Sequence, residues 1–176
     1  MKHALIIAMA FLSCNRPIQP LVVKGNTILL GKIQAKHLEQ PPFSDWYKKG
    51  YAAYQPDPVV KDSLAALVKP YRFELFLGTW CGDSKREVPR IMRLLNDLQV
   101  KSSDITIITV GNSDTLYKQS PTHEEKGKSI YRVPHLNVYR QGKEVGRITE
   151  TPVKSWEKDL LDIVSGKPYV PKYAVK

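Results

Sequence analysis

The stretch Trp80-Cys81-Gly82-Asp83-Ser84 decides the fold prediction, because it lies between two different hydrophobic patterns. The apolar run before it, residues 73–77, is typical of a buried strand. Residues 84–98 after it place their apolar side chains on one side of a helix. Cys81 is therefore predicted to lie at a strand-to-helix junction.

A cysteine at such a junction is a candidate nucleophile. It lies near free N–H groups of the first helical turn and near the positive end of the helix dipole, and both favour the reactive thiolate. Lys85 and Arg86 add positive charge, whereas Asp83 opposes the thiolate. The sequence does not decide which charge prevails at Cys81.

This stretch resembles the active site of the thioredoxin superfamily, which has Trp-Cys-Gly-Pro-Cys at the same junction. Pro89 occupies the position where thioredoxins kink this helix. Arg132-Val133-Pro134 resembles the cis-proline loop of the family, and residues 136–143 resemble its closing hairpin. The resemblance covers roughly residues 71–166.

The resemblance implies an α/β, thioredoxin-like fold: a central mixed β-sheet flanked by helices, here with an N-terminal extension. The resemblance also implies that Cys81 is the catalytic residue and that the backbone of Val133, next to Pro134, binds an extended substrate. The expected supporting residues surround the cysteine: Trp80, Gly82, Asp83, Ser84, Lys85 and Arg86.

Two departures from the family pattern limit the chemistry. Ser84 stands where the family has its second cysteine, and Leu75 stands where it has a buried acid. A serine hydroxyl cannot resolve a mixed disulfide, although it can donate a hydrogen bond to the thiolate. We therefore expect thiol–disulfide exchange through Cys81 alone, with an external thiol resolving the intermediate.

Two other functions stay open. One is a redox-silent module that binds exported client proteins in the groove around Trp80, Val133 and Pro134. The other is a thiol peroxidase, ranked last because Glu74 and Gly78 stand where peroxiredoxins have Pro and Thr or Ser. His135 is a candidate for proton transfer, and His123 is a weaker one.

The N-terminus is typical of an export signal. A short basic start precedes an apolar run too short to span a bilayer, and a small residue precedes Cys14. Residues 1–13 are predicted to be a signal peptide, with residues 14–20 a tether anchored by lipid on Cys14. An ordinary cleaved signal is the alternative. Either interpretation places the protein in the cell envelope, and the lipid anchor favours its periplasmic face.

The composition of the chain limits the kinds of partner that we expect it to bind. The chain of 176 residues has a formal net charge of +10, but its Lys and Arg residues are spread along the whole length. We expect no nucleic acid, and instead exported proteins or small thiols and disulfides, with membrane contact through the N-terminal lipid. The two cysteines cannot form a zinc site alone, so we expect no metal and no cofactor. A Cys14–Cys81 disulfide is the competing use of both thiols.

The remaining chain is divided as follows. Residues 21–70 are an extension packed on the core, with strands at 21–23 and 27–30, a helix capped by Ser44 and another beginning at Asp57-Pro58. Within residues 71–166 we expect a central parallel strand at 105–110 and a helix and loop at 115–129. A last helix is expected from Thr151-Pro152, and residues 167–176 form a C-terminal tail.

Overall fold

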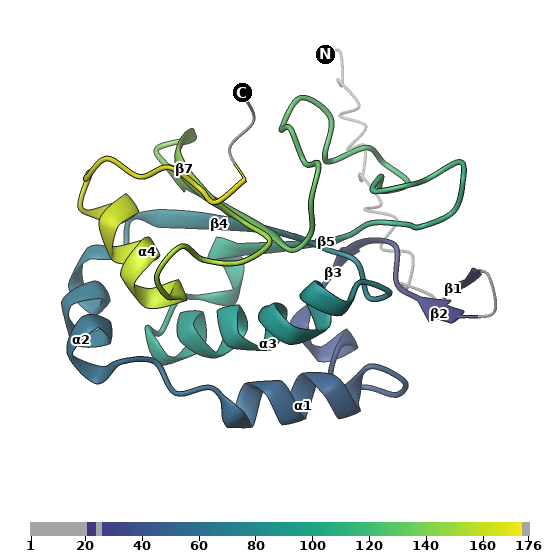
Figure 1. Ribbon diagram of the computed structural model, residues 1–176, viewed down its shortest axis with the longest axis horizontal. Helices are drawn as coiled ribbons and strands as arrows, with labels where there is room; N and C mark the ends of the chain where they lie inside the picture. Colours follow the sequence, from purple (N-terminus) through teal and green to yellow (C-terminus); the bar gives the residue numbers. More distant parts are fainter. Residues whose placement is uncertain (1–20, 24–25, 174–176) are drawn as a thin grey trace, which may run out of the picture.

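The computed structural model describes residues 21–23 and 26–173, so the predicted signal peptide and tether lie outside the described residues. The chain forms an α/β structure around a five-stranded mixed sheet, with strand order β3-β5-β4-β6-β7 (Figure 1). β4 is parallel to β5 and antiparallel to β6, and β7 extends the sheet antiparallel to β6. The strands are β3 (Gly31–Ile33), β4 (Tyr71–Leu77), β5 (Ile105–Thr109), β6 (His135–Arg140) and β7 (Lys143–Thr149).

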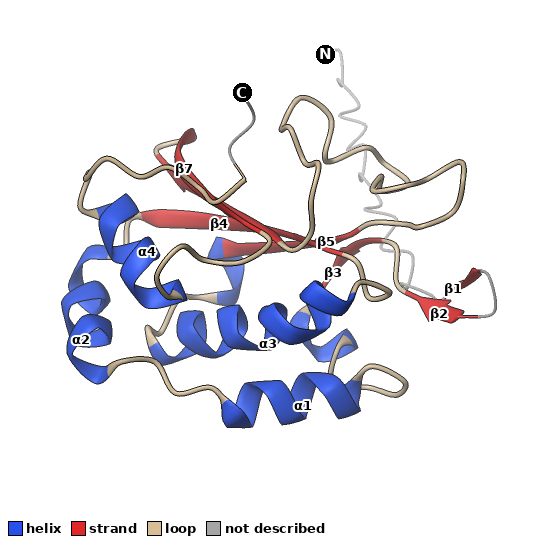
Figure 2. Cartoon of the chain, in the orientation of Figure 1, coloured by secondary structure: helices blue, strands red, loops and turns tan. Residues whose placement is uncertain are grey.

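The four α-helices lie on one side of the sheet, and irregular chain covers the other (Figure 2). They are α1 (Ser44–Ala53), α2 (Pro58–Leu67), α3 (Gly82–Asp97) and α4 (Trp156–Val164), with short 3-10 turns at Ala35–His37 and Ser102–Asp104. A separate hairpin of β1 (Leu21–Val23) and β2 (Asn26–Ile28) precedes the sheet. The predicted mixed sheet with flanking helices is confirmed, with the helices on a single face.

Strand register explains the difference between the faces. Side chains alternate along a strand, so neighbours in sequence face opposite sides. Leu75 pairs with Leu136, and Leu136 pairs with Ile148; this row joins the large core beneath the helices. The next row of the sheet is polar and faces away from the helices: Glu74, Asn137 and Arg147.

The segment before β4 belongs to the same core. β3 pairs antiparallel with β5, α1 packs on α3, and α2 packs on α4. Gly50 of α1 lies so close to Pro89 of α3 that an added Cβ would come within 2.9 Å of the proline side chain. The aromatic residues of α1 are packed on this core, with Tyr47 buried.

The helix predicted within residues 115–129 is absent from the structure, and this prediction was wrong. Residues 110–134 form turns and bends instead. Lys118, His123 and Ser129 have φ angles of 55–58°, in the left-handed region that a right-handed helix does not use. The buried Ser120 also bonds Glu124 and Glu125, which holds the chain in a compact loop. We call residues 111–134 the covering loop.

Several boundaries also differ from the prediction. The last helix begins at Trp156 rather than at Thr151-Pro152, because Asp159 accepts hydrogen bonds from the backbone N–H groups of Val153 and Lys154 and holds them in a loop. β5 is the second strand from the sheet edge, and β4 is central. Ser44 is the first residue of α1 rather than its cap. Asp57 caps α2 through its side chain, as predicted.

Candidate functional site

Cys81 is the N-cap residue of α3, directly after the turn that leaves β4. Its backbone is extended, with φ −83° and ψ 128°, and its carbonyl accepts the first intrahelical bond from Lys85 N at 3.0 Å. The thiol is free and partly exposed. Cys81 thus precedes the N–H groups of the first turn, which lack intrahelical acceptors, although its side chain makes no capping hydrogen bond to them.

The turn before Cys81 is fixed by its neighbours. Cys81 N donates to Gly78 O at 2.9 Å, and the Trp80 indole N–H donates to Val110 O at 2.9 Å, beyond the end of β5. The indole lies against Gly78, where an added Cβ would come within 2.6 Å of the ring. Gly78 is thus required for the position of Trp80, and the sequence interpretation missed it.

Ser84 lies beneath this turn rather than beside solvent. It is fully buried, and its hydroxyl oxygen accepts a hydrogen bond from Gly78 N at 3.2 Å. Thr79, also buried, accepts one from Leu29 N at 3.1 Å and so joins the turn to the N-terminal segment. Both hydroxyls stabilise the loop that carries Cys81.

The charged residues after Cys81 pair with one another. Arg86 bonds Asp83 and Glu87, both at 2.7 Å. The hydrogen bond to Glu87 is the main influence that raises the pKa of Arg86, and Asp83 adds to it. Because Asp83 has a cationic partner, its charge opposes a thiolate less than the sequence alone suggests. Lys85 is exposed on the same turn, and Gly82 has open space around its Cα.

The second part of the site is the end of the covering loop. The Val133–Pro134 peptide bond is cis, which confirms the expectation from the resemblance. Cys81 Sγ lies 3.3 Å from Val133 O and donates a hydrogen bond to it. Val133 is buried against Phe76 and Ile108, and Cys81 packs against the same small cluster. The structure thus brings together residues that are 52 positions apart.

Trp80, which packs on the same small cluster as Cys81, has an aromatic neighbour. The ring of Trp80 lies 6.2 Å from that of Tyr117, whose side chain is mostly exposed. Lys118 Nζ bonds Tyr131 O at 2.6 Å and ties the two arms of the covering loop together. The sequence pattern gave no signal for Tyr117 or Lys118, because a helix was expected there.

The candidate histidines differ in environment. His135 begins β6 and is 1% exposed, so it is not the surface residue that a lone histidine usually is. Burial and the positive charge of Arg147 lower its pKa to about 4, while Asn137 acts in the opposite direction. His135 is therefore neutral at pH 7. His123 lies in the covering loop beside Glu125, at 3.2 Å.

Leu75 is fully buried in the core, so no acid lies at that position beneath the site. Glu87 is the buried acid nearest to Cys81 in sequence, and it binds Arg86, Arg90 and the Trp156 indole.

Within the described part of the chain, no group of three His, Cys, Asp or Glu side chains could hold a metal ion. None of the helices within residues 26–173 is long and apolar enough to cross a membrane.

The chain matches no protein-family model and no curated protein. Among solved structures, it is similar to a crystal structure of a Pseudomonas aeruginosa protein described as being of unknown function. That similarity covers 69% of this chain and 80% of the other, with 14% sequence identity and a TM-score of 0.48. The function must therefore be argued from the site itself.

Proposed function

We propose that the chain is a thioredoxin-like protein that performs thiol–disulfide exchange through the single cysteine Cys81. The observation that carries this proposal is the contact of Cys81 Sγ with Val133 O, at the start of α3 and beside a cis-proline. The strand order and the position of α3 between the parallel strands β4 and β5 are compatible with the thioredoxin fold. The covering loop, in place of a second helix between strands, is a departure from it.

The proposed reaction has three exchange steps. The Cys81 thiolate attacks one sulfur of a client disulfide, a Cys81–client S–S bond forms, and the other client sulfur leaves as a thiolate that takes a proton from water. An external thiolate then attacks Cys81 and expels the client. A second external thiol releases Cys81, so that two external thiols are oxidised to one disulfide while the client disulfide is reduced to two thiols.

The surroundings of Cys81 support this chemistry at one thiol. The Asp83–Arg86 pair reduces the repulsion of a thiolate, and the first turn of α3 offers N–H groups to it. Trp80 packs on the same cluster as Cys81, and the exposed Tyr117 lies next to Trp80, so the two rings supply apolar surface for a client chain. Ser84 is buried beneath the turn, so the resolving thiol comes from outside the protein.

The proposal extends to where the protein acts. We propose that it is exported and held by lipid at Cys14 on the periplasmic face of the cell envelope, where exported proteins provide disulfide substrates. The support is the N-terminal sequence pattern alone, since Cys14 lies outside the described residues.

One observation favours the redox-silent binding module as a second candidate. Cys81 Sγ donates a hydrogen bond to Val133 O, so in this structure the sulfur is engaged with the backbone beside the cis-proline. In that function the exposed aromatic surface near Cys81 holds client chains without exchange. The two candidates differ in whether client capture needs the sulfur.

The test is turnover of a peptide disulfide with glutathione as the external thiol, using the full-length protein. We expect a rate above the uncatalysed background, lost in Cys81→Ser and retained in the matched variant Cys14→Ser. Turnover retained in Cys81→Ser would overturn the proposal. No turnover in the wild type, with equal client binding by wild type and Cys81→Ser, would establish the binding module instead.

A further inference from the structure

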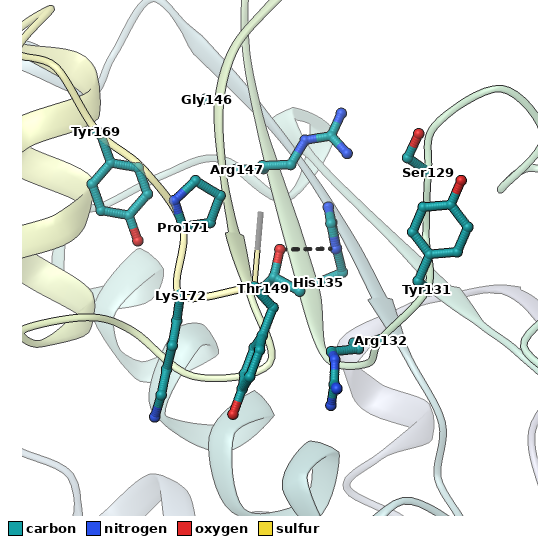
Figure 3. A pocket seen from close by; sticks show the side chains of 11 residues that line it. Ser129, Tyr131, Arg132, His135, Gly146, Arg147, Thr149, Tyr169, Pro171 and Lys172 are labelled. Atoms are coloured by element: carbon teal, nitrogen blue, oxygen red, sulfur yellow. Dashed lines mark hydrogen bonds between the residues drawn. The ribbon is translucent and has the colours of Figure 1, made fainter. Parts of the chain in front are cut away.

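A hollow of about 720 Å³ lies over the sheet face that the helices do not cover (Figure 3). Its floor is formed by β6 and β7, with His135 and Thr149 side by side in one row of the sheet. Ser129, Tyr131 and Arg132 of the covering loop form one wall, and residues of the C-terminal tail form the opposite wall. The C-terminal tail, which is distant in sequence from the loop and the two strands, completes it.

Three cationic side chains line this hollow: Arg132, Arg147 and Lys172. Two of them pair with acids outside the lining, since Arg132 binds Glu150 at 3.0 Å and Arg147 binds Glu144 at 2.6 Å. Arg147 is held in place because its Nε and one terminal nitrogen bind Glu144 and the other terminal nitrogen binds Lys128 O. The tail wall brings Lys172 to the same space, so the hollow attracts anions.

A buried polar atom at the floor has no partner. His135 is 1% exposed, and its Nδ1 lies 3.4 Å from the Thr149 hydroxyl. Its other ring nitrogen, Nε2, is buried without a hydrogen-bond partner among the described residues. In Figure 3 that nitrogen is on the Arg147 side of the ring. When the Thr149 hydroxyl donates to Nδ1, the neutral ring carries its proton on Nε2 and offers an N–H that lacks an acceptor.

The walls are aromatic as well as basic. Tyr131, Tyr169, Pro171 and Tyr173 line the hollow, and Arg132 lies over the ring of Tyr173, 4.3 Å from its centre. Flat apolar surface of this kind accommodates an apolar body, while basic groups and a buried N–H orient an acidic group. Such a set of groups suits an organic carboxylate better than a free inorganic anion.

We infer that this hollow binds the carboxylate of a ligand with a flat apolar body, with Lys172 attracting the acid group and the His135 ring N–H on the floor orienting the ligand. The carboxylate belongs either to a small aromatic acid or to the last residue of a peptide chain. The inference rests on residues of β6, β7, the covering loop and the tail, and it does not need Cys81 to react. Its failure and the failure of the exchange activity are therefore distinguishable.

The test is an NMR titration of the full-length protein, monitored at the His135 imidazole. The probes are 3-phenylpropionate and its neutral amide, and the peptide Gly-Gly-Phe with a free or an amidated C-terminus. We expect saturable shifts of the His135 signals with the acids and an affinity about tenfold lower for the amides, because a charge-assisted contact of ~1.4 kcal/mol is lost. Tighter binding of 3-phenylpropionate supports a small acid, and tighter binding of the peptide supports a chain terminus.

Charge variants provide the control. Lys172→Gln removes an exposed cation of the hollow and should weaken acid binding several-fold, whereas Lys143→Gln makes the same change on β7 outside it and should leave binding unchanged. Equal binding of acids and amides, absence of a saturable shift at His135, or equal effects of the two variants would each overturn the inference.

Discussion

The two faces of the sheet differ in their side chains and in what covers them, although these side chains alternate along the same strands. Beneath the helices, Leu75, Leu136 and Ile148 form an apolar row in which the side chains are buried. On the other face, the covering loop lies over Glu74, Asn137 and His135. The described buried side-chain atoms without hydrogen-bond partners all belong to this side: Asn112 Oδ1, His135 Nε2 and Asn137 Oδ1.

This difference indicates that one face of the sheet supplies most of the stability and that the candidate functional features lie on the other. A buried polar group without a partner costs about 1–3 kcal/mol, so this arrangement is tolerated only if the opposite face supplies the stability. The helix-covered face does so through one continuous core. The loop-covered face holds the hollow at His135. On the same face, Cys81 packs against the small cluster that contains Phe76 and Val133.

The largest effect is expected on the helix-covered face. Leu75→Ala removes a fully buried side chain and should lower the free energy of unfolding by about 2–5 kcal/mol. Tyr131→Ala, on the loop-covered side and 60% exposed, should change it by less than about 0.5 kcal/mol. Urea unfolding measures both values. Similar losses in the two variants would contradict the separation of the faces.

The next effect tests Glu87, which is buried in the helix layer, as Glu157 and Asp159 also are. Glu87 is buried and accepts a 2.8 Å hydrogen bond from the Trp156 indole. Trp156→Phe should cost about 1.5–3 kcal/mol, because a hydrogen bond to a charged group is lost. Adding Glu87→Gln should cost less in the Trp156→Phe background than in the wild type. Additive losses in a double-mutant cycle would show that the two side chains are not coupled.

The next prediction concerns Gly78, which lies in the turn between β4 and α3. Gly78→Ala places a Cβ within 2.6 Å of the Trp80 indole, so the indole must move and its bond to Val110 O is strained. We expect a loss of about 1–3 kcal/mol and slower alkylation of Cys81. The control is Gly82→Ala, where an added Cβ meets nothing within 4 Å. Equal effects at the two glycines would show that the Trp80 position is irrelevant to the thiol.

The smallest effect is the pH dependence due to His135. Its pKa is about 4 in the folded protein and near 6.5 when exposed, so the unfolded chain takes up the proton first as pH falls. Stability should therefore decrease below about pH 6.5 and stop decreasing from this cause below about pH 4, with a loss of about 1 kcal/mol between pH 7.5 and 5.5. Urea midpoints of the wild type and His135→Gln measure it. Equal losses in both proteins would rule out His135 as the cause.

The sequence predicted the elements with a strong local pattern. The apolar run of β4, the amphipathic α3 and the helix start at Asp57-Pro58 followed from periodicity and residue type, and the junction at Cys81 followed from both neighbours. The cis bond at Pro134 came from the resemblance and not from any local rule.

The helix expected within residues 115–129 was wrong although the sequence holds signals against it, since Pro121 and Gly127 both disfavour a helix interior. The particular path of the covering loop was not predictable, because it is held by the bonds of Ser120 with Glu124 and Glu125 and of Lys118 with Tyr131. The hollow at His135 was missed because one of its walls is the C-terminal tail, which is distant in sequence from β6. The start of the last helix was placed too early because the Asp159 side chain, which holds the Val153 N–H in a loop, lies six residues further along the chain.

The central claim is that the fold makes Cys81 a reactive thiol at the junction of the two faces. The most direct test is the rate at which Cys81 reacts with the disulfide 5,5′-dithiobis(2-nitrobenzoate) in the full-length Cys14→Ser protein, folded and in urea. The first turn of α3 should make the folded rate about two to five times the unfolded rate, since a helix terminus contributes about 0.3–1 kcal/mol to an adjacent negative charge. A folded rate below the unfolded rate would contradict the account and favour the redox-silent binding module.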